Sequence, residues 1–285
     1  MAKVQVITDS TADISKDLIE ELGISIVPLK VHLGGESYLD GITISPSEFY
    51  SRLKETDELA TTSQPSPVDF VEAYREAAKD GDTDILSIHL SSALSGTYQS
   101  ALLAQSMVED EFKVTVIDSK KASYAIGMIV VEVAKAAKEG KSLDECVEIT
   151  HRIIDQEQIY FLVDTLEYLQ KGGRIGKASA MVGSLLNIKP ILTLNAEGEV
   201  SPVEKVRGKS KATDRIFELL KEKMKNGVDK AAVVYTDNRK EAESWAKRLK
   251  EMFDMEDVEL TEFGPVIGAH TGPGTLAVVA LPKQW

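Results

Sequence analysis

The alternation of short apolar segments with amphipathic helical segments along the first 140 residues is the strongest constraint on the fold. Residues 84–90 and 113–118 are short, largely apolar and rich in β-branched side chains, which is typical of buried strands. Residues 67–81 and 124–140 carry apolar side chains at helical spacing. A chain that alternates in this way forms α/β structure, so we expect a mostly parallel, doubly wound sheet with helices on both faces.

The second half of the chain has a different pattern. Residues 191–206 predict two strands joined by a turn at Asn195–Gly198, which is a hairpin and not a parallel crossover. Further helical and extended segments follow, so we expect an α+β sheet domain. Because 285 residues suffice for two domains of ordinary size, we divide the chain into an α/β domain, residues 1–155, and an α+β domain, residues 156–285.

Charge and cysteine content argue against several classes of function. The 33 basic and 46 acidic residues give a net charge of −13, which disfavours general binding to nucleic acid or to anionic membranes. Cys146 is the single cysteine, and the four histidines lack metal-binding spacing, so we expect neither a disulfide nor a metal site. No segment resembles a signal peptide or a membrane span, which favours a cytoplasmic protein.

Hydroxyl-rich segments follow the predicted strands. They are Thr8–Asp13, Ile88–Gly96 and Val116–Ser123, and residues 61–67 add a fourth such segment before a helix. The carboxyl ends of parallel strands lie at one edge of a sheet, where hydroxyls and backbone N–H groups together can bind a carboxylate or phosphate. The ordinary alternative is that each segment caps its own helix, since Ser and Thr are common N-cap residues.

Two further segments combine basic charge with unusual composition. Residues 171–177 form a Gly-rich basic hinge before a predicted apolar helix that carries Met181, Leu185 and Leu186. Such a helix can wall an adaptable apolar pocket, or it can belong to an ordinary core. Residues 204–215 are basic in an acidic chain, which suggests an anionic partner or ligand, although a solvated helix start is the alternative.

An independent enzyme is the competing interpretation. Ser92 or Ser95 with His270 and Asp118 would supply a hydrolase triad, but the GxSxG motif is missing. The GxxxxGK[ST] phosphate loop is missing too, which disfavours nucleotide hydrolysis by this chain. His270 stands among glycines, in residues 268–274, so we expect a loop that approaches a ligand closely, or else an ordinary loop histidine.

Eight segments, in order along nearly the whole chain, make the sequence similar to the DegV family. They are ITDSTADIS, TTSQPSP, SSALSGTYQSA, VIDSKKAS, LEYLQKGGRIG, LNIKPIL, VRGKSKA and HTGPGTL. The resemblance implies a two-domain α/β fold that holds a long-chain fatty acid in the cleft between the domains. The carboxylate would lie between the domains and the tail in an apolar tunnel.

The resemblance also implies roles for residues of this chain. The residues at the carboxylate would be Thr61, Thr62, Ser63, Ser92, Ser95, Gly96, His270 and Thr271. The resemblance does not indicate which of their hydroxyls contact the carboxylate. The acyl chain would contact Met181, Leu185, Leu186, Ile188 and Ile191. Arg174 and Arg207 would face a partner protein or an incoming phosphate.

That partner follows from the same resemblance. The chain is similar to the binding subunit of a bacterial fatty acid kinase, which presents the carboxylate to a separate ATP-using subunit that makes acyl phosphate for phospholipid synthesis. We therefore expect a lipid carrier without catalytic residues or a cofactor, able to make transient contact with a membrane. An independent serine hydrolase or a small-molecule phosphotransferase remains the alternative.

Overall fold

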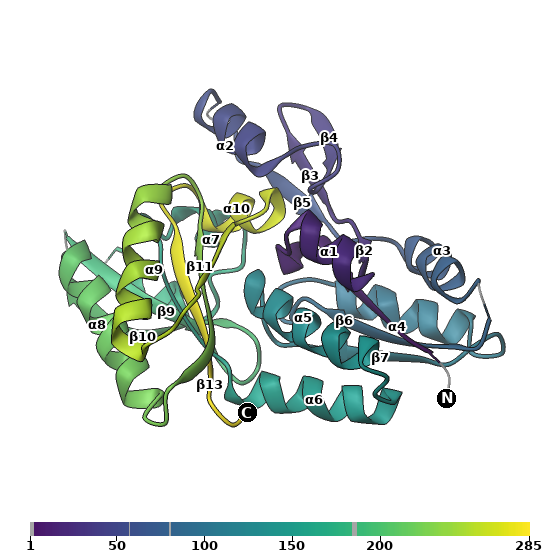
Figure 1. Ribbon diagram of the computed structural model, residues 1–285. Helices are drawn as coiled ribbons and strands as arrows, with labels where there is room; N and C mark the ends of the chain where they lie inside the picture. Colours follow the sequence, from purple (N-terminus) through teal and green to yellow (C-terminus); the bar gives the residue numbers. More distant parts are fainter. Residues whose placement is uncertain (1–2, 57, 80, 184–186) are drawn as a thin grey trace.

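A computed structural model of the chain describes residues 3–56, 58–79, 81–183 and 187–285 (Figure 1). The chain folds into two domains, each built on its own sheet and helices. The N-terminal domain has a four-stranded sheet and the C-terminal domain a six-stranded sheet, and a three-stranded sheet projects from the N-terminal domain. This arrangement confirms the expected two-domain α/β fold.

The N-terminal sheet is parallel throughout, with strand order β2-β1-β6-β7. Helices α3 and α4 cover one face, and α5 and α6 cover the other, so the sheet is doubly wound as predicted. Short helices η1 and α1 follow β1. The bounds are β1 Lys3–Asp9, η1 Ser10–Ala12, α1 Lys16–Leu22, β2 Ser25–Val27, α3 Pro67–Ala78, β6 Thr83–His89, α4 Thr97–Met107, β7 Val114–Asp118, α5 Tyr124–Lys138 and α6 Leu143–Gln156.

The projecting part is an antiparallel sheet of order β4-β3-β5, accompanied by helix α2 (Figure 1). The hydroxyl-rich residues 61–63 form the edge strand β5 of this sheet. Side chains of successive strand residues point to opposite sides of a sheet, so Thr62 points away from the side on which Thr61 and Ser63 lie. The bounds are β3 Lys30–Leu33, β4 Glu36–Leu39, α2 Pro46–Lys54 and β5 Thr61–Ser63.

The C-terminal sheet is mixed, with strand order β10-β9-β8-β13-β11-β12. The predicted hairpin is present as β9 and β10, closed by a hydrogen bond from the Gly198 N–H to the Asn195 carbonyl at 2.9 Å. Helices α8 and α9 cover the outer face. The bounds are β8 Gln158–Leu162, α7 Glu167–Lys171, η2 Gly176–Met181, β9 Ile188–Leu194, β10 Val200–Arg207, α8 Lys209–Lys223, β11 Val228–Tyr235, α9 Arg239–Phe253, β12 Glu259–Glu262, α10 Pro265–Thr271 and β13 Leu276–Pro282.

Two local predictions differ from the structure. The described part of the expected apolar helix is a 3₁₀ turn that ends at Met181, followed by the extended, exposed Val182. Leu185 and Leu186 lie outside the described residues. His270 lies not in a loop but in the last turn of α10, because Pro265 at the first turn favours helix and Gly272, at φ 75°, ends it.

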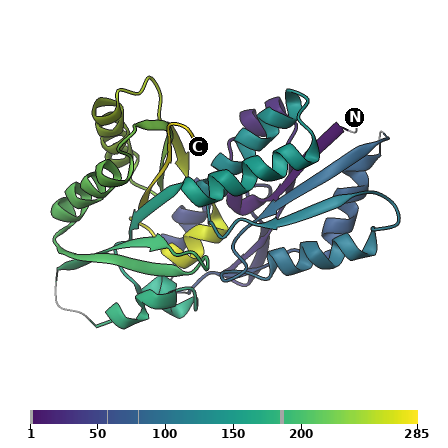
Figure 2. The same ribbon diagram turned by 90° about the horizontal axis from the view of Figure 1, so that it is seen from below.

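The largest apolar cluster is continuous across the two domains. It contains Val6 and Ile88 from the N-terminal sheet together with Phe161 and Val279 from the C-terminal sheet. Helix α10, yellow in Figures 1 and 2, lies between the two domains in both views. Its Val266 belongs to the same cluster. The boundary between the domains is therefore an apolar interface, and a ligand cavity at this boundary can be lined by apolar side chains.

Candidate functional site

A cavity lies at this interface, with walls from both domains. It holds about 730 Å³ of space between atoms, its open mouth included. Most of its lining is apolar: Leu29, Leu90, Leu94, Ala122, Ile159, Phe161, Leu169, Leu194, Val200, Phe263, Val266, Ile267 and Ala277. The polar lining residues are Thr62, Ser95, Ser123, Arg174, His270 and Thr271.

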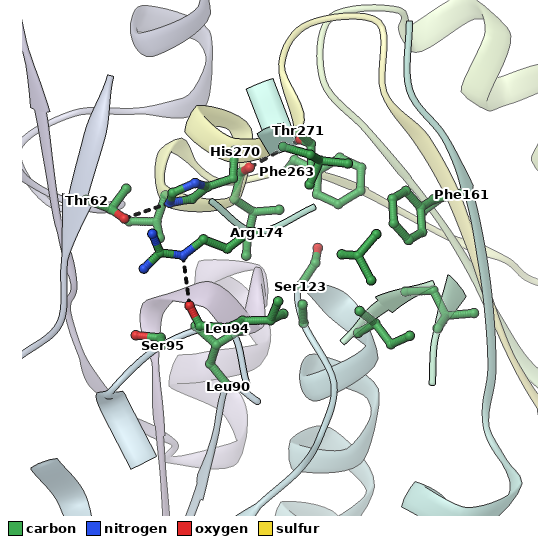
Figure 3. A pocket seen from close by; sticks show the side chains of 18 of the residues that line it. Thr62, Leu90, Leu94, Ser95, Ser123, Phe161, Arg174, Phe263, His270 and Thr271 are labelled. Atoms are coloured by element: carbon green, nitrogen blue, oxygen red, sulfur yellow. Dashed lines mark hydrogen bonds between the residues drawn. The ribbon is translucent and has the colours of Figure 1, made fainter. Parts of the chain in front are cut away.

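Four of the polar side chains gather at one side of the cavity. Figure 3 shows Thr62, Ser95, Arg174 and His270 there, while Phe161 and Phe263 lie at the other side. We call these four residues the head-group cluster. They come from four separate segments, namely β5, the loop before α4, the residues after α7, and α10. The cavity is thus amphipathic, with one polar end.

His270 is held as a neutral imidazole. Its Nε2 lies 2.8 Å from Thr62 Oγ1, and its Nδ1 is buried with no hydrogen-bond partner among the described residues. Nδ1 packs against Gly172, where a Cβ atom would lie only 2.4 Å away. Burial, with a smaller contribution from the Arg174 charge, lowers the pKa of His270 to about 4. The ring therefore carries no charge near neutral pH.

Arg174 supplies the positive charge of the cluster. Its Nε donates to the Leu94 carbonyl oxygen at 3.0 Å, and its Nη1 donates to the Gly172 carbonyl oxygen at 2.7 Å (Figure 3 draws the first bond). These two bonds fix the guanidinium plane. The resemblance implies that Arg174 faces a partner protein or an incoming phosphate. The structure places it in the cavity wall, so the hydroxyls are accompanied by a cation.

The other residues expected at the carboxylate are arranged in three ways. Thr271 lines the cavity, but its hydroxyl donates to the Ile267 carbonyl within α10. Ser92 donates to Asp118 Oδ2 at 2.5 Å and does not line the cavity. Gly96 is the N-cap of α4 and packs against the end of the Gln64 side chain, which would have to move to make room for a Cβ atom.

Thr61 and Ser63 flank Thr62 on β5 and point away from it. Both are exposed, and Ser63 Oγ lies 3.0 Å from His32 Nε2 on the other side of the small sheet. The alternation of side chains along a strand is the physical reason. Of the three neighbouring hydroxyl residues, only Thr62 lines the cavity.

The apolar residues predicted for the acyl pocket do not line this cavity where the structure describes them. Met181 and Ile188 line a separate, more polar depression beside Asp164 and Lys189. Ile191 is fully buried in the cluster under α8 and α9, on the opposite face of the sheet. Leu185 and Leu186 are not described.

The apolar walls that the sequence does not predict come from loops, from α7 and α10, and from strands of the C-terminal sheet. Ile159 and Phe161 of β8 face the cavity, as do Leu194 of β9 and Val200 of β10. A period-two pattern could have identified such a set, but it cannot tell which of the two faces meets the N-terminal domain.

The hydrolase alternative finds no triad at the expected residues. His270 contacts Thr62, and Ser92 contacts Asp118, so these pairs do not form one relay. A chain of hydrogen bonds does link Ser87, His89 and Asp9, at 2.6 Å and 3.0 Å. All three side chains are fully buried, so a substrate cannot reach them, and their place is in the core of the N-terminal sheet.

Arg207 lies far from the cavity-lining residue Val200 on the same strand. It is exposed at the end of β10, and seven residues of extended chain span about 23 Å. Among the described residues, no three His, Cys, Asp or Glu side chains gather as metal ligands, and no helix has the length and apolarity needed to cross a membrane.

Comparisons with known proteins agree with this arrangement. A family model described as "Uncharacterised protein, DegV family" matches residues 3–283. A DegV domain-containing protein of Clostridium perfringens is 42% identical over 279 residues, which cover 96% of this chain and 97% of that protein.

Solved structures give the same result. A structure described as DegV, a fatty acid binding protein from Bacillus subtilis, is similar with a TM-score of 0.91 at 37% identity, covering 99% of this chain and 100% of the other. A stearic acid-binding protein of Eubacterium ventriosum is similar with a TM-score of 0.90 at 26% identity, covering 99% of both chains. The chain therefore belongs to the DegV family.

Proposed function

We propose that the protein binds a long-chain fatty acid in the cavity between its domains. The observation that carries this proposal is the polarity of the cavity: a cation and hydroxyls gather at one end, and the rest of the lining is apolar apart from Ser123 and Thr271. The carboxylate would contact Arg174, Ser95 and Thr62, and the acyl chain would extend along Phe161 and Phe263. The fatty acids named in the descriptions of the similar structures support the ligand class.

The Thr62–His270 pair supports binding of an anion. A neutral imidazole has one N–H, and Nδ1 of His270 is buried against Gly172. The imidazole can therefore influence hydrogen bonding to a ligand only through Nε2 and the Thr62 hydroxyl. We assign the proton to Nε2, which donates it to Thr62 Oγ1. The Thr62 hydroxyl proton is then free to donate to the carboxylate, and Arg174 strengthens the contact by charge.

The energy of binding comes mainly from the tail. Burial of an acyl chain yields about 0.8 kcal/mol per CH₂, so a chain of more than a dozen carbons gains roughly 10 kcal/mol before the costs of association. The head-group cluster is then needed chiefly to orient the ligand and to select a carboxylate.

We further propose that the bound acid is a substrate for a separate, ATP-using kinase subunit. A carboxylate oxygen would attack the γ-phosphorus of ATP on that subunit, the bond to ADP would break, and acyl phosphate would leave for phospholipid synthesis. This chain would contribute no catalytic residue or cofactor of its own, and would act in the cytoplasm with transient membrane contact. Exposed Arg207 is a candidate contact for the kinase subunit, because a cation there can pair with an acidic partner surface.

The ligand test is extraction of the purified, denatured protein with organic solvent, followed by mass spectrometry. Stoichiometric fatty acid supports binding, whereas a protein that neither retains nor takes up fatty acid contradicts it. An esterase assay decides the alternative, because turnover abolished in Ser95→Ala would indicate a hydrolase. Acyl phosphate formation requires addition of a fatty acid kinase subunit and ATP, with the wild-type chain lacking ligand as the blank.

A further inference from the structure

One wall of the cavity belongs to the C-terminal domain but is held in place by the N-terminal domain. This wall, residues 261–271, includes α10 and contributes Phe263, Val266, Ile267, His270 and Thr271 to the lining. In Figure 3, His270, Thr271 and Phe263 lie together above Ser123 of α5's N-cap. The placement of His270 therefore depends on what fixes the start of this wall.

Asp13 connects this wall to Ser123, which lines the cavity from the N-terminal domain. Its Oδ1 accepts a hydrogen bond from the Gly264 N–H at 3.0 Å, and its carbonyl oxygen accepts one from Thr261 Oγ1 at 2.9 Å. Ser123, which lines the cavity, donates to Asp13 Oδ2. The fit is tight, since a Cβ at residue 264 would lie 2.6 Å from Asp13 Oδ1. Asp13 thus fixes the spacing between two cavity walls.

Asp40 holds the next turn of the same wall. It is 3% exposed, and its carboxyl group accepts hydrogen bonds from the Val266 backbone N–H and, at 2.8 Å, from Ser10 Oγ. Ser10 Oγ in turn accepts from the Leu29 N–H at 3.0 Å, and both Leu29 and Val266 line the cavity. Asp40 therefore also connects lining residues of the two domains.

Tyr50 makes a third contact with this wall. Its hydroxyl donates to the Phe263 carbonyl at 3.0 Å and packs on Gly268 of α10.

Both carboxyl groups lie in an environment that makes ionisation costly. Burial raises the pKa of Asp13 well above its ordinary value, and it raises the pKa of Asp40 to about 7. Neither carboxyl forms an ion pair among the described residues. Burying a carboxyl group without a cation costs desolvation free energy, but the group provides several directional hydrogen-bond acceptors in a small volume.

We infer that Asp13 and Asp40 are positioning residues, which fix the 261–271 wall and thereby hold His270 where the head-group cluster can distinguish a carboxylate from an uncharged head group. This inference rests on the proposed function. Neither acid contacts the ligand in this scheme. Their removal should impair recognition of the carboxylate more than burial of the tail.

The test compares palmitic acid with methyl palmitate on the full-length protein after lipid has been stripped from it. The measured quantity is the ratio of the two affinities. In Asp13→Ala and Asp40→Ala this ratio should fall about fivefold, the effect of losing roughly one hydrogen bond. Asp13→Asn and Asp40→Asn should keep the ratio, because the amide oxygen still accepts from the Gly264 and Val266 N–H groups.

The control is Glu157→Gln, which removes a buried carboxyl group elsewhere and should leave the ratio unchanged. If an alanine variant does not fold, Tyr50→Phe and Thr261→Val each remove one hydrogen bond to the same wall and should lower the ratio in the same direction. An unchanged ratio in folded variants, or equal losses for both ligands, would overturn the inference. A wild-type protein that binds neither ligand would instead contradict the proposed function.

Discussion

His270 and Thr62 are 208 residues apart in the sequence, and their side chains meet at 2.8 Å across the boundary between the domains. Thr62 comes from the small sheet that projects from the N-terminal domain, and His270 from the helix that fills the interface. The contact can form only when the two domains are docked. The head-group cluster is therefore a property of the assembled interface, not of either domain.

Thr62→Val should reduce fatty acid affinity about tenfold, because it removes the hydroxyl donor and leaves both nitrogens of His270 without partners. The matched control is Thr61→Val, since Thr61 is next in sequence but exposed on the other side of β5. Titration calorimetry with a stripped protein measures both. Equal losses in the two variants would show that Thr62 has no special contact with the ligand.

Arg174→Met should weaken binding of a fatty acid and leave binding of its methyl ester nearly unchanged, because only the carboxylate interacts with the guanidinium charge. The control is Lys177→Met, which removes an exposed cation three residues away that pairs with Glu197 and Glu199. Fluorescence competition with both ligands measures the difference. If Arg174→Met weakened binding of the acid and of the ester equally, Arg174 would act only through its hydrogen bonds to the Leu94 and Gly172 carbonyl oxygens.

The sheets and helices could be predicted because their signals are local. The parallel units of the first half and the hairpin at Asn195–Gly198 follow from apolar spacing and turn residues within short segments. The same is true of Ser66 and Ser142, whose side chains form capping boxes with the third residue of each helix. None of these features depends on a distant part of the chain.

The cavity could be predicted only in outline, because its lining depends on which face of each element meets the other domain. Ile191 and Leu194 both lie on β9, but Ile191 faces α8 and α9, whereas Leu194 faces the cavity. Thr61 and Thr62 differ in the same way. The position of Arg174 in the cavity wall could not be predicted, because a sequence does not reveal that two backbone carbonyls hold its guanidinium inward.

Ala277→Leu should shorten the cavity, because the small side chain at this lining position would be replaced by a bulky one in a close-packed wall. When the affinity of the variant is measured for saturated fatty acids of increasing length, it should fall more for the long acids than for the short ones. Ile191→Val provides the control, since it alters the opposite face of the same sheet and should leave the chain-length profile unchanged. A uniform loss across the series would mean that Ala277 does not border the tail.

Glu157→Gln should stabilise the protein at alkaline pH, because both carboxyl oxygens of Glu157 are buried and have no hydrogen-bond partner in the part of the chain that the structure describes. Burial raises its pKa from 4.5 to about 8, so the folded chain keeps a proton that the unfolded chain releases. Between these values the wild type loses stability as pH rises, whereas glutamine stays neutral. The variant should therefore match the wild type near pH 4.5 and exceed it by a few kcal/mol at pH 8, because each unit of pKa shift corresponds to about 1.4 kcal/mol. Urea unfolding at both pH values measures this, with the exposed Glu148→Gln as control; a constant difference between the two pH values would exclude Glu157 as the titrating group.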